Sequence, residues 1–212
     1  MIKDSLVQII TTIALSLVIL CISIELTVSF KPLFYYDINA LHIEQDASMN
    51  RGDIVKNYDY LINFVYSRDK VNFKLPTLPS SVDASEHFYQ VKNLFIEMSY
   101  ILVGGIIILV LGVIYSIRKK QFKFLNWGPI LLTSFIVIMG IFFTTNFDET
   151  FTIFHKLFFR NSLWLFDPNT DPVITMLPET FFLHCGIMIL AIILISSCLL
   201  ILLGKKLKKY KS

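Results

Sequence analysis

Residues 94–117 read LFIEMSYILVGGIIILVLGVIYSI, and Arg118-Lys119-Lys120 follow at once. A helix of about 20 apolar residues crosses the roughly 30 Å hydrocarbon layer of a bilayer, so this run predicts a transmembrane helix with a basic anchor at its end. Three more apolar runs of similar length lie at residues 6–30, 125–145 and 181–203. The sequence therefore predicts an α-helical integral membrane protein with four transmembrane helices.

The composition excludes most soluble classes of protein. The 212 residues are 55% hydrophobic and 17% charged, whereas a soluble domain has about 25% charged residues. Single-domain soluble enzymes, coiled coils, disordered tails and nucleic-acid-binding modules are therefore excluded. Cys21, Cys185 and Cys198 all lie within apolar runs, which argues against a disulfide framework or an exposed thiol site.

The first apolar run begins shortly after Lys3 and could be mistaken for a secretory signal. It is longer than the apolar region of such a signal, and no small-residue cleavage site follows it. We therefore expect it to be an uncleaved transmembrane helix.

The basic residues predict the orientation in the membrane. The residues on one side of the expected spans include ten bases and a single acid, Asp4; the bases are Lys3, Arg118, Lys119, Lys120, Lys123, Lys205, Lys206, Lys208, Lys209 and Lys211. The segments 31–93 and 146–180 carry nine basic and thirteen acidic residues. Because short cytoplasmic flanks are enriched in lysine and arginine, we expect both termini in the cytoplasm and both long segments outside.

This orientation divides the chain into alternating spans and flanks. The expected parts are transmembrane helices at 1–30, 94–117, 125–145 and 181–203, an extracytoplasmic cap at 31–93, a cytoplasmic basic loop at 118–124, an extracytoplasmic loop at 146–180 and a cytoplasmic basic tail at 204–212.

Three ionisable residues interrupt the spans, and all three fall near the outer boundary of the hydrocarbon. Counting about 1.5 Å per helical residue from the inner ends places Glu25, Glu97 and His184 at similar depth. Boundary placement avoids the cost of about 2.5 to 3.5 kcal/mol for a charge at mid-bilayer. Either they lie there only for that reason, or they surround a polar pocket that opens at the outer leaflet. His184 has the further option of a hydrogen bond inside the helix bundle.

The cap is predicted to be a small α+β unit. Residues 34–44 alternate weakly between apolar and polar, and apolar residues between 54 and 65 recur at helical spacing after a candidate cap, Asp53. Residues 71–75 alternate and precede Pro76, which predicts a short strand ending in a turn.

The helix of the second span is expected to begin before the membrane. Asp83 is a candidate N-cap with Glu86 three residues later, and a polar stripe follows on one helical face, formed by Glu86, Gln90, Asn93 and Glu97. His87 lies beside this stripe. Glu86 either caps the helix or belongs to a site, and His87 is either a solvated surface residue or part of the same site.

The second outer loop contains an amphipathic helical pattern. Phe151, Phe154, His155 and Phe158 share one face, and cationic residues lie on the other. Such a helix lies flat in the membrane interface, so we expect His155 on its lipid-directed face. The histidine is either a packing residue or a catalytic one. Trp164, in the turn-rich segment that follows, is a candidate interface anchor.

Two histidines on separate outer segments, with carboxylates nearby, permit general acid and base chemistry at the boundary between water and lipid. No Ser-His-Asp elbow, His-Glu-x-x-His or Cys-x-x-Cys spacing occurs in the sequence, so a covalent nucleophile is the weaker option. A metal site with two histidines and carboxylates is compatible with the composition but has no spacing signature.

The same segments resemble the bacterial lipoprotein intramolecular transacylase family. The resemblance is carried by Ser85-Glu86-His87 with Val91-Lys92, and by Phe147-Asp148, Phe154-His155, Phe158-Phe159, Asn161, Trp164, Asp167-Pro168, Asp171, Leu177-Pro178-Glu179 and Phe182. It implies an enzyme of the bacterial cell membrane, without a cofactor, whose substrates are diacylated lipoproteins. The enzyme would move the sn-2 acyl chain of the lipoprotein to the α-amino group of its own N-terminal cysteine.

The family's two catalytic histidines correspond to His87 and His155. Possible orienting or oxyanion groups are Glu86, Asp148 and Asn161, and possible lipid-substrate contacts are Phe151, Phe154, Phe158 and Trp164. Membrane lipid is an expected partner, and nucleic acid and metal are not. The alternatives are an outer-leaflet lipid hydrolase, an intermolecular acyltransferase, or a non-enzymatic scaffold or transporter accessory.

Overall fold

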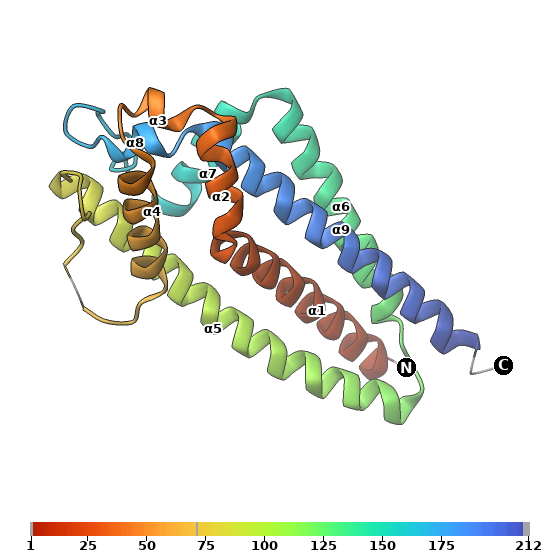
Figure 1. Cartoon of the computed structure of the whole chain (residues 1–212). Helices are drawn as coiled ribbons and strands as arrows, with labels where there is room; N and C mark the ends of the chain where they lie inside the picture. The colour runs from red at the N-terminus through yellow and green to blue at the C-terminus, as the bar shows by residue number, and fades with distance from the viewer. Residues whose placement is uncertain (1, 71, 210–212) are drawn as a thin grey trace. The chain divides into compact units, whose positions relative to one another are not determined.

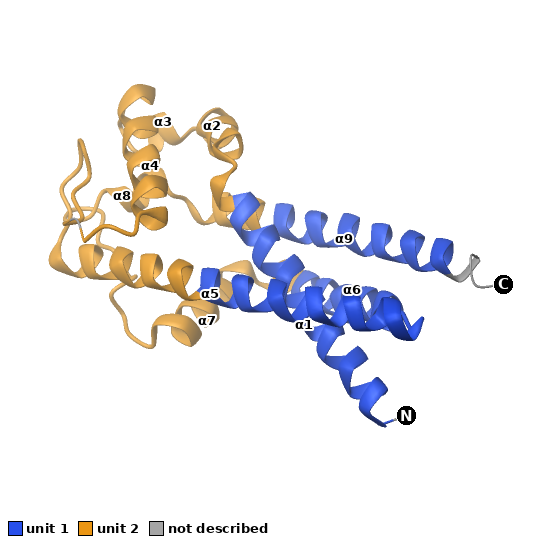
Figure 2. Ribbon diagram, turned by 90° about the horizontal axis from the view of Figure 1, so that it is seen from below, with its two compact units in different colours: residues 1–27, 98–142, 187–212 blue, residues 28–97, 143–186 orange. Residues whose placement is uncertain are grey.

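The computed structural model describes residues 2–70 and 72–209, and these ranges contain nine helices and no strand. In chain order the helices are α1 (Ile2–Ser29), α2 (Lys31–Ala40), α3 (Ile43–Asp46), α4 (Arg51–Tyr66), α5 (Val82–Lys119), α6 (Phe124–Thr145), α7 (Phe147–Phe159), α8 (Val173–Met176) and α9 (Glu179–Lys209), as Figure 1 shows. They form two compact units (Figure 2). Unit 1 comprises residues 1–27, 98–142 and 187–212, and unit 2 comprises residues 28–97 and 143–186.

Four of the helices are long and apolar enough to cross a membrane: α1, α5, α6 and α9. They contain the four predicted spans, which confirms that part of the fold. Within unit 1 many large apolar side chains remain exposed, for example Ile107, Leu111 and Leu199. Exposed apolar surface of this extent is unusual for a soluble protein and is compatible with lipid as the surrounding solvent.

Glycines let α1 and α5 approach closely within unit 1. A methyl group added at Gly112 would lie 2.1 Å from Oγ1 of Thr11, and one at Gly105 would lie 3.0 Å from Cγ2 of Val18. Small residues are frequent where membrane helices meet, because packing rather than hydrophobic transfer drives their association there. The two glycines are seven residues apart and therefore lie on the same side of α5.

A buried amide joins three helices of unit 1. Nε2 of Gln8 donates to Oγ of Ser116 at 2.8 Å, and Oε1 of Gln8 accepts a 3.3 Å hydrogen bond from the backbone N–H of Phe124. Gln8 is fully buried. The bonds offset the cost of burying its amide, and they connect the starts of α1 and α6 to the last turn of α5.

The core of unit 2 is aromatic and aliphatic. Phe34 of α2 stacks on Tyr58 of α4 with ring centroids 3.8 Å apart, and Phe181 of α9 contacts both rings edge-on. Val173 and Met176 of α8 are fully buried in the same cluster. Residues of α2, α3, α4, α5, α8 and α9 thus share one hydrophobic core, which holds these parts of unit 2 together.

The prediction of an α+β cap is wrong, since the described part of unit 2 consists of helices and irregular segments and contains no strand. Residues 34–44 lie mainly in α2 and α3, because Phe34 and Ile38, one helical turn apart, are the residues that enter the core. Residues 72–75 are extended, and Phe73 and Leu75 are buried as alternation requires. The N–H of Lys74, however, donates to the hydroxyl of Tyr60 rather than to another strand. Val71, which belonged to the predicted strand, lies outside the described residues.

Two predicted helix caps are displaced. The N-cap of α4 is Asn50, whose side-chain oxygen accepts from the N–H of Asp53. At α5, Oγ of Ser81 accepts from the N–H of Ala84 at 3.0 Å, so the capping residue lies two residues before the expected Asp83 and the helix begins at Val82. Both capping residues precede the predicted ones because a cap must stand before the first turn.

The start of α5 is tied to the second outer loop. The N–H of Ser81 donates to Oδ1 of Asp171 at 2.6 Å, and Oγ1 of Thr170 donates to the other carboxylate oxygen at 2.8 Å. Asp171 is nearly fully buried. This carboxylate therefore joins two segments of unit 2 that are distant in the sequence and that both carry candidate site residues.

His184 binds Asp37. Nδ1 of His184 lies 2.9 Å from each carboxylate oxygen of Asp37, and the Asp37 side chain is completely buried. Among the options weighed for His184, a hydrogen bond within the fold is the one found. The pair connects α2 to the first turns of α9 inside unit 2.

Candidate active site

His87 and His155 lie side by side in unit 2, although they come from different outer segments. Their ring centroids are 5.9 Å apart and their planes are inclined by 34°. His87, on α5, is 6% exposed, and His155, on α7, is 8% exposed. The interpretation of His87 as a solvated surface residue is therefore wrong.

Aromatic rings enclose the two imidazoles. His87 contacts Phe159 and Phe166 with centroid distances of 4.7 and 5.5 Å. His155 contacts Phe151 at 4.1 Å and Trp164 at 4.7 Å. This wall of rings removes water from both imidazoles and leaves their nitrogen atoms as the main polar groups of an apolar surrounding.

One side of α7 faces the interior of unit 2 and the other side is exposed. Asn146 caps the helix by accepting from the N–H of Glu149 at 3.1 Å. His155 lies on the inner side, while Phe154 and Phe158 are 45% and 49% exposed. The expectation that His155 lies on the lipid-directed face is therefore wrong. The apolar side of α7 is wide, so one part of it, with His155, is buried, and another part, with Phe154 and Phe158, is exposed.

A backbone bond determines the tautomer of His155. Its Nδ1 lies 2.8 Å from the carbonyl oxygen of Phe151, one helical turn earlier. A carbonyl can only accept, so Nδ1 carries the proton and donates it. In the neutral ring Nε2 then has a free lone pair, and a general base accepts its proton through this lone pair.

His87 differs from His155 in that its Nδ1 is buried and has no hydrogen-bond partner in the structure. An unpaired buried polar atom costs about 1 to 3 kcal/mol, and such atoms in native proteins call for an explanation such as a catalytic role or a bound molecule.

Burial lowers the pKa of both histidines, which lie outside the apolar spans. For His87 the pKa falls to about 4, because burial disfavours the imidazolium and His155 adds electrostatic repulsion when it is charged. For His155 burial lowers the pKa, and the bond to the Phe151 carbonyl partly opposes the shift. Both rings are therefore neutral at pH 7 and available for proton transfer.

Asn161 uses its side chain to fix the loop after α7. Its Nδ2 donates to Oε1 of Gln90 at 3.0 Å and to the carbonyl of Phe159 at 2.8 Å, while its Oδ1 accepts from the N–H of Leu163. Its backbone carbonyl accepts from Nε1 of Trp164 at 2.9 Å. These bonds hold the indole against His155, and the orienting role predicted for Asn161 stays a prediction. So does its alternative role in stabilising an oxyanion.

The two candidate carboxylates lie outside the aromatic enclosure. Glu86 is exposed although its neighbour His87 is buried. Asp148 is exposed in the first turn of α7, seven residues and about 10 Å along the helix from His155. Burial raises the pKa of the Glu179 carboxyl, and a hydrogen bond with Asp148 raises it further. The orienting roles of Glu86 and Asp148 remain predictions.

Several residues of the enclosure were not among the predicted site residues. Phe88, Phe159 and Phe166 contact His87, and Gln90 holds Asn161. Helical spacing could have indicated Phe159, four residues after His155, and Gln90, three residues after His87. Nothing local indicates Phe166, which follows an irregular loop. Within the described ranges no three His, Cys, Asp or Glu side chains form a group that could hold a metal ion.

A sequence model of the family described as lipoprotein intramolecular transacylase Lit matches residues 9–182. The chain belongs to the Lit family. It is thus a membrane-integral acyltransferase, which confirms the resemblance seen in the sequence. Among curated proteins no significant match is found.

Solved structures agree with the membership in the Lit family. The membrane-integral Lit from Bacillus cereus is 37% identical to this chain, with a TM-score of 0.95 over 99% of this chain and 97% of that one. Two further structures of the same protein each carry one substituted histidine, by arginine and by alanine. Both are 36% identical, with TM-scores of 0.89 over 99% of this chain and 93% and 95% of theirs.

Proposed function

We propose that this Lit family member moves the sn-2 acyl chain of a diacylglyceryl lipoprotein to the α-amino group of the N-terminal cysteine of the same molecule. The product is a lyso-form lipoprotein, N-acylated and with one chain left on the glycerol. The observation that carries the proposal is the pair of neutral, buried histidines inside an aromatic enclosure, one of them with an unpaired ring nitrogen.

The reaction needs a base, because the α-amino group has a reference pKa near ~8 and is partly protonated at pH 7. We assign this role to Nε2 of His155, whose Nδ1–H is donated to the Phe151 carbonyl. The amine, once deprotonated, attacks the ester carbonyl carbon. The C–N bond forms, the carbonyl π electrons move to its oxygen, and the imidazolium of His155 holds the proton.

His87 then acts on the oxygen atoms of the ester. When the proton of His87 is on Nδ1, the unpaired N–H donates a hydrogen bond to the oxyanion. Such a bond stabilises the oxyanion most strongly in a site without water. Collapse of the tetrahedral intermediate breaks the bond to the glyceryl oxygen, which takes the proton back from His155. The nitrogen still carries two protons and a positive charge after the attack, and it loses one of them to neutral His155, which passes that proton to water. The transfer therefore consumes no water and releases the one proton that the ammonium group held.

The apolar walls favour an intramolecular reaction. A substrate that carries its own amine and ester needs only to be folded so that they meet, and such proximity is worth up to about 7 to 11 kcal/mol. Phe151 and Trp164 pack on His155, and Phe154 and Phe158 contact each other at an exposed surface with their rings inclined by 42°. We propose that these rings contact the acyl chains of the substrate.

We further propose that the site faces the outer leaflet of the bacterial cell membrane, with both termini in the cytoplasm and α7 in the membrane interface. The distribution of ten basic flanking residues supports this orientation. Diacylglyceryl lipoproteins display their ester and amine at the headgroup level, which is where a site carried by the outer segments can reach them.

The test is mass spectrometry of the N-terminal lipopeptide of a reporter diacyl lipoprotein, from cells with this protein or its variants. Wild type should give an N-acylated, monoacylglyceryl cysteine with an unchanged number of acyl chains. We expect His87→Ala and His155→Ala each to reduce transfer by at least about 10²-fold. His42→Asn is the matched control, because His42 is exposed and has a positive φ that asparagine tolerates.

Loss of an acyl chain as free fatty acid would support the hydrolase, and dependence on added phospholipid would support an intermolecular acyltransferase. Activity unaffected by both substitutions would contradict histidine catalysis. The alanine variant of the Bacillus cereus protein keeps a TM-score of 0.89 with this chain, so loss of a histidine is compatible with this fold.

A further inference from the structure

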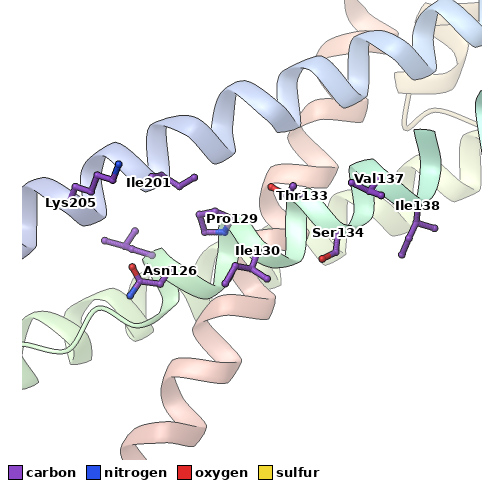
Figure 3. Close-up of a pocket in the computed structure, with 10 residues that line it drawn as sticks. Asn126, Pro129, Ile130, Thr133, Ser134, Val137, Ile138, Ile201 and Lys205 are labelled. Carbon is purple, nitrogen blue, oxygen red and sulfur yellow. The ribbon is translucent and has the colours of Figure 1, made fainter. Parts of the chain in front are cut away.

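Unit 1 contains a groove between α6 and α9 that the proposed reaction does not use. It has a volume of about 640 Å³ and opens on the side of the helix pair. Its walls include Asn126, Pro129, Thr133 and Val137 of α6 with Ile201 and Lys205 of α9, as Figure 3 shows. The walls are mainly apolar, and the polar groups Asn126 and Lys205 lie together at one end.

The shape of the groove follows from the side chains of the two helices. At its polar end α6 and α9 pack closely, because a methyl group at Gly204 would already lie 3.5 Å from Cβ of Leu125. Pro129 cannot donate to the carbonyl of Leu125, which interrupts the helix ladder there. Beyond this point the short side chains of Thr133 and Ser134 leave the space between the helices unfilled.

The length of the groove matches one membrane leaflet. Asn126 and Val137 are eleven residues apart, which is about 16 Å along a helix. Half of the roughly 30 Å hydrocarbon layer is about 15 Å. An acyl chain that lies parallel to α6, with its polar end beside Lys205, would therefore reach from the membrane surface to mid-bilayer.

The charge at the polar end selects an anion. Lys205 lines the groove at this end, whereas Lys206, its neighbour in the same basic flank, does not. The acid of the basic flanks, Asp4, already accepts a hydrogen bond from the hydroxyl of Tyr115. Basic pockets between transmembrane helices on the cytoplasmic side bind the head groups of anionic lipids.

We propose that this groove binds one acyl chain of an anionic glycerophospholipid, with the lipid phosphate at Lys205 and the second chain in the bilayer. The acyl chain fills the space that the short side chains between α6 and α9 leave open, and so stabilises the packing of these two helices. The site is separate from the histidine pair and requires neither acyl transfer nor its substrate.

The first experiment compares lipids by native mass spectrometry of the full-length protein in a neutral detergent, with equal amounts of phosphatidylglycerol and phosphatidylcholine. We expect about five-fold preferential retention of phosphatidylglycerol, which is the contribution of one basic residue near an anionic surface. Lys205→Ala should remove the preference, Lys205→Arg should keep it, and the neighbouring control Lys206→Ala should leave it nearly unchanged. Equal retention of both lipids, or equal effects of Lys205→Ala and Lys206→Ala, would overturn the proposal.

The second experiment tests the groove itself. Val137→Phe fills the groove and should reduce retention of phosphatidylglycerol several-fold. Ile141→Phe is similarly exposed on the same helix but lies outside the residues that line the groove, so it should not. Soluble glycerol phosphate should fail to compete, because it has no acyl chain. Competition by glycerol phosphate, or equal retention by the two phenylalanine variants, would show binding of an anion without the groove and would contradict the proposal.

Discussion

Burial decides the protonation state of the two histidines. Each ring is more than nine-tenths buried, and the contacts are aromatic rings and one carbonyl instead of carboxylates. An acid beside an imidazole would raise its pKa, whereas these surroundings lower it. These surroundings therefore keep both imidazoles neutral without a carboxylate partner.

Stability should fall as the pH falls. In the unfolded chain a histidine titrates near ~6.5, whereas folded His87 titrates at about 4, so between these values the unfolded state binds more protons. The contribution of His87 to the free energy of unfolding is therefore fully present above pH 6.5. It is lost as the pH falls toward 4, and the loss amounts to about 3 kcal/mol. The measurement is thermal unfolding in detergent at pH 7 and pH 5.

His87→Gln, which does not titrate, should show a smaller loss between these two pH values than wild type, and the exposed control His42→Asn should behave as wild type. An identical pH dependence in His87→Gln and wild type would mean that the ring does not titrate at a lowered pKa.

The Asp37–His184 pair should be essential for stability. His184→Leu leaves the completely buried carboxyl group of Asp37 without its hydrogen-bond partner, and a buried polar group left unpaired costs about 1 to 3 kcal/mol, more where it is charged. Replacing both residues by leucine removes the buried charge and should recover much of the loss. Unfolding of the two single variants and the double variant, measured as a double-mutant cycle, checks the coupling. Additive losses would show that the two groups do not interact.

At the scale of the elements, the apolar period identifies a helix but not the side that it buries. In α7 His155 is buried, while Phe154 and Phe158 are exposed, although all three belong to the same broad apolar side. The loop after α7 makes the difference: Asn161 places Trp164 against His155. A helix wheel contains no information about that loop.

The contact between α1 and α5 should tolerate no side chain at Gly112. Gly112→Ala places a methyl group 2.1 Å from Oγ1 of Thr11, and overpacking of this kind costs about 1 to 3 kcal/mol. Gly104→Ala on the same helix is the matched control, since nothing lies within 4 Å of its added methyl group. It should be neutral or stabilising by up to about 1 kcal/mol. Equal melting temperatures for the two variants would contradict close packing at Gly112.

At the scale of the whole molecule, the four spans and the basic flanks make the topology testable. Asp83 is exposed before the second span and Lys119 is exposed after it. In intact cells Asp83→Cys should react with a membrane-impermeant maleimide, while Lys119→Cys should react only after permeabilisation. The native cysteines are all in apolar runs and provide the background. The reverse labelling pattern would invert the proposed orientation.

The sequence by itself determined the four transmembrane helices, since a local apolar run of sufficient length is enough to specify each one. It also indicated the helical segment at 54–65, a helical pattern from 151 to 158 and, through the family resemblance, His87 and His155. Only the tertiary structure decided that the described part of the cap has no strand and that His155 faces inward. The same holds for the partners of His184 and Asn161, which are 147 and 71 positions away in the chain. Burial and hydrogen bonding at these residues depend on such long-range contacts, which no local pattern encodes.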